Sequence, residues 1–293
     1  MLVGCGGLRE PPWLEAGMLT FPLSQPLLWR VFGPDACERE LSVLSSKQVE
    51  AFGRDGFLVL PGLGSQALCN QLVELTMTWL AAQQQPLEYE ADVDYPGSPE
   101  SRAAEGGLTV RRLRQAYARH PLLQQWATGA QLAQPLQQLL GEPVWLVQAH
   151  HNCIMTKQPA YSSATGWHRD IRYWSYQRPE LISAWLALGD ESIDNGCLWV
   201  VPGSHLLPIG ADRFDERLFL RPDHPDNLPL LQQAQAVPLH AGDVLLFHAN
   251  LFHAAGRNHT RQSKYSLVFT YRNAGNLPLP DSRSAEPGDI PLI

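Results

Sequence analysis

The chain has 293 residues, of which 44% are hydrophobic, and a formal net charge of −7. A chain of this length can bury a full hydrophobic core, and an all-β domain of this size is commonly one unit. The negative charge gives no electrostatic footprint for a nucleic-acid backbone or an anionic membrane surface. No apolar run approaches the roughly 18 residues that a membrane span needs. We therefore expect one globular domain with neither nucleic acid nor membrane as a partner.

Several common site types are excluded by the motifs that the chain lacks. Its five cysteines are scattered and include no Cys-x-x-Cys pair, which argues against a disulfide framework and a zinc ribbon. This usage favours a reducing, cytoplasmic setting. There is no Gly-x-Ser-x-Gly elbow of a serine hydrolase and no Gly-rich phosphate loop that ends in Lys-Ser/Thr.

Helical signals dominate the first half of the chain, and short β-type runs with turn residues between them follow from Val144 onward. This change of pattern predicts helices that support a barrel or jelly roll. In chain order, we first expect an N-terminal extension (1–43), a helix that begins at a capping box of Ser45 and Gln48, and a strand (57–60). A helix with a core-facing stripe then begins at Ser65, and a second helical region lies between Pro121 and Gly141. Later in the chain, Asn195-Gly196 predicts a turn that needs positive φ.

Two segments have the composition of irregular structure. Residues 86–107 contain six acidic side chains against one arginine, together with three prolines. This composition predicts either a disordered loop or a mobile lid, and no packed element. Residues 206–236 are proline-rich with little periodicity, and they predict a long insertion of the kind that roofs a binding site.

The most informative pattern consists of two histidines and one aspartate. His168 and Asp170 are two positions apart, so both side chains would point to the same side of one strand. His253 follows an apolar run, 244–248, that predicts a buried strand. Two imidazoles and a carboxylate bind iron in mononuclear Fe(II) oxygenases and leave positions open for a co-substrate and O₂. His248, on the same run, is the alternative third ligand.

A second constellation lies on the predicted strand over residues 264–271. Lys264 and Ser266 share one face of that strand by the same period of two. A cation and a hydroxyl that point inward together would suit a dicarboxylate. The Arg111 to Arg114 cluster, the one basic run of the chain, is expected to be solvated or partly inward, with one arginine as a candidate for the site.

Taken in order, these motifs resemble the phytanoyl-CoA dioxygenase family of Fe(II)/2-oxoglutarate-dependent oxygenases. The resemblance implies a mainly β fold with supporting helices, a double-stranded β-helix (jelly-roll, cupin-like) barrel. It also implies a dioxygenase domain over residues 44–272 and a C-terminal tail over 273–293. The segments that carry it are Lys47 to Leu60, His168 to Trp185, Asn195 to His205 with its Pro-Gly-Ser-His ending, and Gly242-Asp243 to His253.

By this resemblance, His168, Asp170 and His253 are the iron ligands and catalytic residues, and the protein uses Fe(II), 2-oxoglutarate and O₂. Lys264, eleven positions after His253, takes the place that binds the 2-oxoglutarate carboxylate, where better-known members have arginine. Lysine keeps the positive charge but lacks the bidentate fork of arginine. The other residues expected beside the co-substrate are Ser266, Trp185 and His151, of which Trp185 and His151 have a plain core position as their alternative.

The implied reaction is hydroxylation of an unactivated C–H bond of a small-molecule substrate, with release of succinate and CO₂. Asp170 favours hydroxylation over halogenation, because halogenating relatives lack this carboxylate. Two alternatives remain open: a barrel metalloenzyme that does not use 2-oxoglutarate, which Lys264 would support, and a non-catalytic barrel that binds a small ligand. The acidic residues from Glu88 to Asp94 argue against a polyphosphate-bearing coenzyme A substrate.

Overall fold

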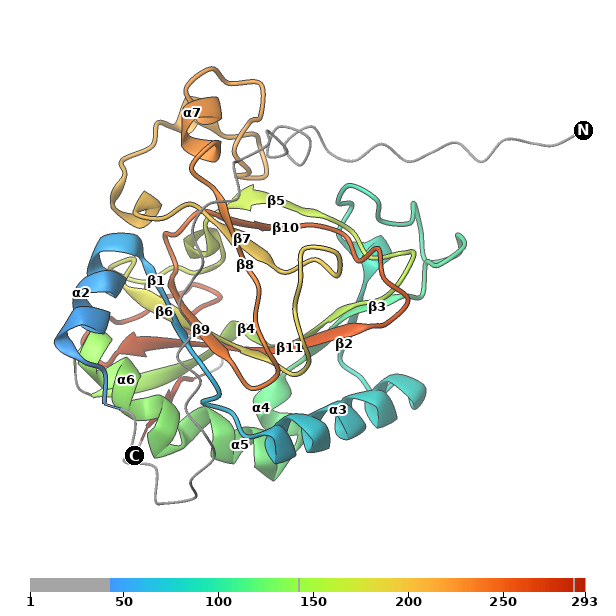
Figure 1. The fold of residues 1–293 in the computed structure, drawn as a ribbon, viewed down its shortest axis with the longest axis horizontal. Coiled ribbons are helices and arrows are strands. Elements are labelled where there is room, and N and C mark those ends of the chain that lie inside the picture. The colour runs from blue at the N-terminus through green and yellow to red at the C-terminus, as the bar shows by residue number, and fades with distance from the viewer. Residues whose placement is uncertain (1–42, 142, 287, 293) are drawn as a thin grey trace, which may run out of the picture.

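The computed structural model describes residues 43–141, 143–286 and 288–292, so that the predicted N-terminal extension lies outside the described residues except for Val43. Two β-sheets face each other, and helices cover one of them (Figure 1). The larger sheet has the order β1-β9-β6-β11-β4-β3-β2, with β12 also paired to β4, and the smaller sheet has the order β5-β10-β7-β8. Within the described ranges the two sheets stay separate and do not close into one continuous barrel.

The strands of the larger sheet are β1 (Phe57–Leu60), β2 (Leu87–Tyr89), β3 (Val110–Arg114), β4 (Val144–Lys157), β6 (Leu181–Ala187), β9 (Val244–His248), β11 (Lys264–Asn273) and β12 (Ile290–Pro291). The smaller sheet contains β5 (Thr165–His168), β7 (Leu198–Val200), β8 (Gln235–Val237) and β10 (His253–Ala255). The α-helices are α2 (Ser46–Asp55), α3 (Gln66–Ala81), α4 (Ala116–Arg119), α5 (Pro121–Thr128), α6 (Ala130–Leu140) and α7 (Asn227–Leu231).

The helix ends follow the local signals in the sequence. At the start of α2, the Ser45 hydroxyl accepts from the Gln48 amide, and the Gln48 side chain accepts from the Ser45 amide at 2.9 Å. These two bonds satisfy donors that have no partner inside the helix. Pro121 begins α5, and Gly141, with φ of 75°, ends α6. The predicted helix starts and stops in this half of the chain are therefore confirmed.

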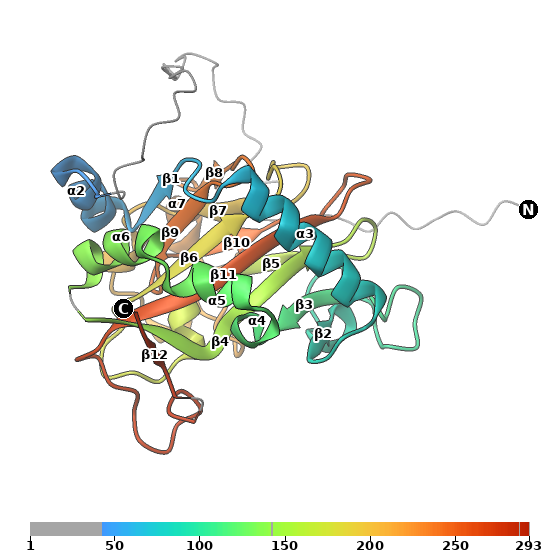
Figure 2. The same cartoon turned by 90° about the horizontal axis from the view of Figure 1, so that it is seen from below.

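Two hydrophobic layers hold the fold together. Helices α3, α5 and α6 lie against the outer face of the larger sheet (Figure 2), where Leu72, Leu136 and Leu267 are fully buried in one cluster. A second cluster, which includes Val200 and Val268, fills the space between the two sheets. Burying one large aliphatic or aromatic side chain contributes roughly 1.5–3 kcal/mol. The helices thus cover the outer face of the larger sheet, and any site between the sheets has to lie beside this second cluster.

Strands β4 and β11 pair antiparallel along most of their length, but the register breaks in the middle. Asn152 pairs with Phe269, and the next residue of β11, Thr270, pairs with Val147. Residues 148–151 of β4 therefore bulge out without a partner in β11, and His150 takes a φ of 62°. A bulge of this kind redirects the side chains that follow it.

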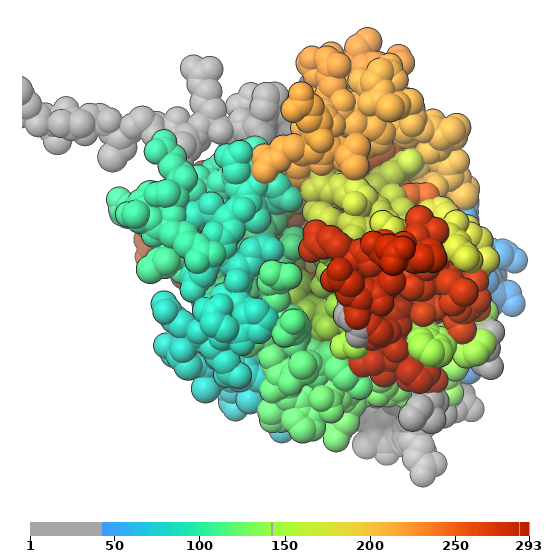
Figure 3. All heavy atoms as spheres, turned by 180° about the vertical axis from the view of Figure 1, so that it is seen from behind, coloured from blue at the N-terminus to red at the C-terminus, as the bar shows by residue number. Residues whose placement is uncertain are grey.

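Two segments that were expected to be irregular contribute strands to the larger sheet. The expectation that residues 86–107 form no packed element is wrong at their start, where β2 pairs with β3 and Glu90 is fully buried. An arginine partner from β3 offsets the cost of burying that acidic side chain, which composition could not reveal. The segment predicted as a C-terminal tail returns to the sheet as β12, and it covers one face of the molecule (Figure 3).

Candidate active site

Three candidate metal ligands come together where β5 and β10 pair. His168 ends β5 and lies directly opposite His253, the first residue of β10. Asp170 follows in a short 3₁₀ turn, Asp170–Tyr173, so the expectation that one strand carries both His168 and Asp170 is wrong. Arg169 between them is nevertheless extended, and both side chains project to the same side. One ligand atom from each of the three residues lies within 4.8 Å of the others.

Backbone carbonyls fix the orientation of both imidazole rings. Nδ1 of His168 lies 2.8 Å from the Gly166 carbonyl oxygen, and Nδ1 of His253 lies 3.0 Å from the Leu251 carbonyl oxygen. A carbonyl oxygen only accepts, so each Nδ1 carries the hydrogen. Each Nε2 then faces Asp170 Oδ1, at 3.3 Å from His168 and 3.4 Å from His253. The two Nε2 atoms and Asp170 Oδ1 therefore converge on one point, which is the arrangement that a bound cation requires.

The pKa shifts of the three groups differ in direction. Burial opposes protonation of His253, but the Asp170 carboxylate raises the pKa of this imidazole above its usual value. Burial, assisted by nearby His253, lowers the pKa of the His168 imidazole to about 3, so this ring is neutral. Burial opposes ionisation of Asp170, yet His151 and His253 hold the pKa of its carboxyl well below the usual range. Asp170 is fully buried, and neither carboxylate oxygen has a hydrogen-bond partner within the described chain. A buried carboxylate in this state is costly, and a divalent cation would offset the cost.

His151 reaches the same carboxylate from the β4 bulge. Its Nδ1 lies 3.2 Å from Asp170 Oδ2, and its ring meets Trp174 edge-on at a centroid distance of 5.0 Å. Its neighbour His150 does not line this cavity and borders a different surface hollow instead. The structure therefore places His151 beside the cavity, as expected, and directs its neighbour elsewhere.

The residues expected to bind the co-substrate carboxylate lie together, but they contact a carboxylate of the chain itself. Lys264 Nζ donates to Glu191 Oε2 at 2.8 Å. The Ser266 hydroxyl and the Trp185 indole N–H both donate to Glu191 Oε1, at 2.6 and 2.9 Å. Glu191 was not predicted as a site residue, because Asp190, Glu191 and Asp194 have the composition of a solvated turn.

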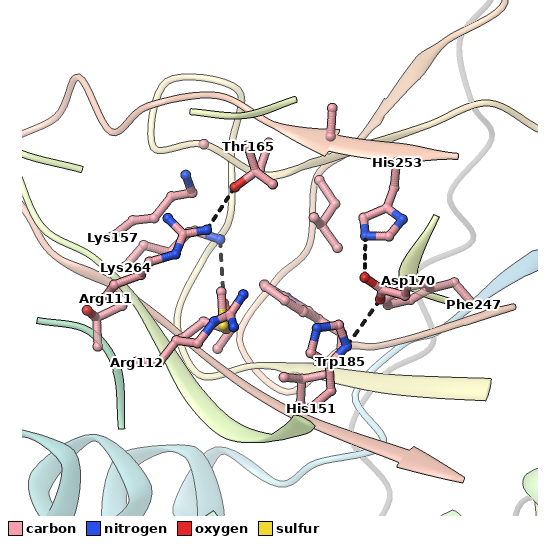
Figure 4. Close-up of a pocket in the computed structure, with 18 of the residues that line it drawn as sticks. Arg111, Arg112, His151, Lys157, Thr165, Asp170, Trp185, Phe247, His253 and Lys264 are labelled. Atoms are coloured by element: carbon pink, nitrogen blue, oxygen red, sulfur yellow. Dashed lines mark hydrogen bonds and ion pairs between the residues drawn. The ribbon is translucent and has the colours of Figure 1, made fainter. Parts of the chain in front are cut away.

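Further cations line the cavity on the side of Lys264. Arg111 donates to Ser163 Oγ at 2.8 Å and lies 3.3 Å from Glu90. Lys157, directly across the strand pair from Lys264, donates to the carbonyl oxygens of Ser163 and Gly256. Arg111, Lys157 and Lys264 lie on one side of the cavity, and Asp170 and His253 lie on the other (Figure 4). The cavity thus has one end with the candidate metal ligands and one cationic end.

Lys157 is a second residue that sequence reasoning missed. Burial, together with nearby Arg111, lowers the pKa of its ammonium to about 7. Lys157 shares a strand face with Met155, which also lines the cavity, but nothing in the sequence marked this face as the inner one. Gly196 makes room for the lysine, since a Cβ there would lie 2.9 Å from Lys157 Cδ. Its φ of 79° confirms the positive φ predicted for this turn.

Apolar side chains also line the cavity. They come from both sheets and are Met155, Leu198, Phe247, Ala254, Ala255 and Val268, with Arg112 and Thr165 completing the rim of polar groups.

The remaining histidine candidate lies outside the cavity. His248 Nδ1 accepts from the Asn250 amide at 3.0 Å, and its ring lies 5.2 Å from that of His205. The geometry therefore favours His253 over His248 as the third ligand.

The long insertion over residues 206–236 approaches the site at one point. The Phe219 ring lies 5.5 Å from His168, and the Arg172 guanidinium lies 4.0 Å from the Phe219 ring. Tyr95 and Tyr173 complete a surface hollow with these side chains. The insertion thus covers the edge of the candidate metal site, as the sequence predicted.

Comparison with known proteins identifies the family. The profile of the family described as phytanoyl-CoA dioxygenase (PhyH) matches residues 52–266. The chain belongs to the phytanoyl-CoA dioxygenase family. It is an oxygenase that depends on Fe(II) and 2-oxoglutarate, as the resemblance of its motifs predicted.

Individual relatives of the phytanoyl-CoA dioxygenase family agree with this assignment. A probable phytanoyl-CoA dioxygenase of Caenorhabditis elegans is 24% identical over 246 residues, which are 80% of this chain and 77% of the relative. An ectoine dioxygenase of Sphingopyxis alaskensis is 27% identical over 252 residues, with the same coverage of 80% and 77%. The crystal structure of EctD from S. alaskensis with 2-oxoglutarate and 5-hydroxyectoine matches with a TM-score of 0.66 and 24% identity, covering 85% of each chain.

The structural match confirms the predicted jelly-roll fold of this phytanoyl-CoA dioxygenase family member. Among the described residues, no helix is both long and apolar enough to cross a bilayer.

Proposed function

We propose that His168, Asp170 and His253 bind the Fe(II), and that the chain hydroxylates a C–H bond of a small molecule at the mouth of this cavity. The observation that carries the proposal is the fully buried Asp170 carboxylate, which two imidazole Nε2 atoms face and which accepts no hydrogen bond from the described residues. When bound, Fe(II) supplies the activation of O₂, coupled to oxidative decarboxylation of 2-oxoglutarate to succinate and CO₂.

The surrounding residues have separate tasks in this proposal. His151 orients Asp170 through its second oxygen. The cationic end of the cavity attracts the far carboxylate of 2-oxoglutarate, with Lys264, Ser266 and Trp185 as the expected contacts. The apolar side chains that line the cavity exclude water from the reacting atoms.

For the primary substrate, we infer that it approaches through the surface hollow lined by Tyr95, Arg172, Tyr173 and Phe219, because two of these rings also contact His168. Aromatic rings around a guanidinium suit a small, partly apolar molecule with an anionic group. The ectoine dioxygenase relative supports a substrate of this size.

The scattered, odd number of cysteines supports a cytoplasmic setting.

The test is a screen for substrate-stimulated release of succinate. Protein reconstituted with Fe(II) without oxygen is mixed with 2-oxoglutarate and small molecules, and O₂ is then added. We expect one class of small molecule to increase succinate release and to gain one oxygen atom, and His168→Ala to do neither. Succinate release that is the same in the wild type and in His168→Ala would contradict the proposed site.

A further inference from the structure

Glu191 occupies the donors that the co-substrate's far carboxylate would need. Its Oε2 accepts from Lys264, and its Oε1 accepts from Ser266 and Trp185, so both carboxylate oxygens are satisfied. The Glu191 side chain is fully buried, and that of Lys264 is 3% exposed. The ammonium also lies 5.3 Å from the centre of the Trp185 ring. An internal carboxylate thus makes the contacts expected of a bound one.

The backbone holds Glu191 in this position. Its amide donates to the Leu239 carbonyl at 2.7 Å, and the Leu239 amide donates back to the Glu191 carbonyl at 3.0 Å. This isolated bridge ties the turn before β7 to the segment after β8. The backbone of Glu191 therefore sits at a fixed point of the fold, and the contact with Lys264 breaks only when one of the two side chains rotates.

The charge of Glu191 determines how its contact with Lys264 affects the binding of the 2-oxoglutarate dianion. Glu191 neutralises Lys264, and Glu90 lies against Arg111. The two contacts of the Lys157 ammonium are carbonyl oxygens, which bring no negative charge. A second carboxylate that arrives in this water-poor cavity meets the negative charge of Glu191, and like charges brought together cost free energy.

We propose that Glu191 is a specificity-determining residue for the co-substrate, because it competes with the far carboxylate of 2-oxoglutarate for Lys264, Ser266 and Trp185. This inference rests on the proposed function of the cavity. Glu191 lowers the affinity for a dicarboxylic 2-oxo acid and leaves that for a monocarboxylic 2-oxo acid nearly unchanged. The chain therefore discriminates weakly between the two, although four basic side chains line its cavity.

Two ligands and two variants isolate this effect. 2-Oxopentanoate has the carbon chain of 2-oxoglutarate with a methyl group in place of the far carboxylate. Glu191→Gln keeps the shape of the side chain and removes its charge. Asp190→Asn makes the same chemical change one residue earlier, on a side chain that is 77% exposed. Each 2-oxo acid is titrated calorimetrically, without oxygen, into Fe(II)-loaded wild type, Glu191→Gln and Asp190→Asn, so that the readout is binding and not turnover.

We expect Glu191→Gln to bind 2-oxoglutarate on the order of tenfold more tightly than the wild type, because the substitution removes the like charge that the far carboxylate would meet. Binding of 2-oxopentanoate should change by less than about twofold, and Asp190→Asn should match the wild type with both ligands. Unchanged or weaker 2-oxoglutarate binding by a folded Glu191→Gln protein would overturn the proposal, because Glu191 would then only position Lys264.

A measurement on the wild type alone keeps the proposal testable if Glu191→Gln does not fold. The wild type should prefer 2-oxoglutarate over 2-oxopentanoate by less than about tenfold, whereas a free buried cation would give on the order of a hundredfold or more. A large preference would overturn the role of Glu191 and leave co-substrate use intact. Absence of binding by either ligand to Fe(II)-loaded wild type and Glu191→Gln would instead overturn co-substrate use itself, and this proposal with it.

Discussion

His151 Nδ1 lies 3.2 Å from Asp170 Oδ2, although no regular strand pairing would bring these two residues together. The contact depends on residues 148–151, which bulge out of β4 where its register with β11 breaks. Asp170 therefore has a histidine at each of its oxygens: His168 and His253 face Oδ1, and His151 faces Oδ2. Several predictions about stability and metal binding depend on this arrangement and on the buried charges beside it.

Replacing His151 should weaken metal binding without removing a ligand. His151→Ala frees Asp170 to rotate, and loss of such a supporting contact typically costs about 10- to 100-fold in metal affinity. Anaerobic Fe(II) titration measures the effect, and His150→Ala is the matched control because His150 does not line the cavity. Equal loss of affinity in both variants would show a general disturbance of the bulge and no specific role for His151.

Replacing a ligand should abolish metal binding. His168→Ala, Asp170→Ala and His253→Ala each remove one of three donors, and we expect the wild type to bind one Fe(II) per chain and these variants to bind none under the same conditions. His248→Ala is the control, since that imidazole bonds to the Asn250 amide outside the cavity. Metal analysis after gel filtration gives the stoichiometry. Retention of iron by His253→Ala together with its loss in His248→Ala would move the third ligand to His248.

Breaking the ion pair between Lys264 and Glu191 should destabilise the fold more than removing both charges. Lys264→Met leaves the fully buried Glu191 carboxylate without its cation, and removal of one partner of a buried pair costs about 3–5 kcal/mol. The double variant Lys264→Met/Glu191→Gln removes both charges and should recover most of this loss. Urea denaturation of the wild type, both single variants and the double variant measures the coupling. Additive effects of the two substitutions would show that the pair makes no net contribution.

Lys157 should make the stability of the protein depend on pH above neutrality. Burial lowers the pKa of its ammonium to about 7, below the value of 10.5 for an unperturbed lysine. Between these values the unfolded chain binds more protons than the folded one, so the free energy of unfolding increases as pH rises. The slope is at most about 1.4 kcal/mol per pH unit.

Urea midpoints at pH 7, 8 and 9 test this dependence, because Lys157→Met should remove the increase. Lys47→Met, at an exposed position of α2, is the control and should keep it. Parallel curves for the wild type and Lys157→Met would exclude Lys157 as the titrating group.

The sequence determined the features that depend on neighbours along the chain. The capping box of Ser45 and Gln48, the positive φ of Gly196 and the projection of His168 and Asp170 to one side all follow from local backbone geometry. The order of the motifs also predicted the family and the jelly-roll fold, and both are confirmed.

Only the tertiary structure decided which charges meet inside the cavity. Glu191 and Lys264 are 73 positions apart, and nothing in a turn-like acidic stretch shows that one of its side chains is buried against a lysine. Glu90 was expected in an irregular segment for the same reason, since its partner Arg111 lies on another strand. The β4 bulge that delivers His151 depends on the register with β11, which no period of two along a single strand contains. Local patterns fix backbone conformation, whereas the pairing of buried charges depends on strand register and packing between segments far apart in the chain.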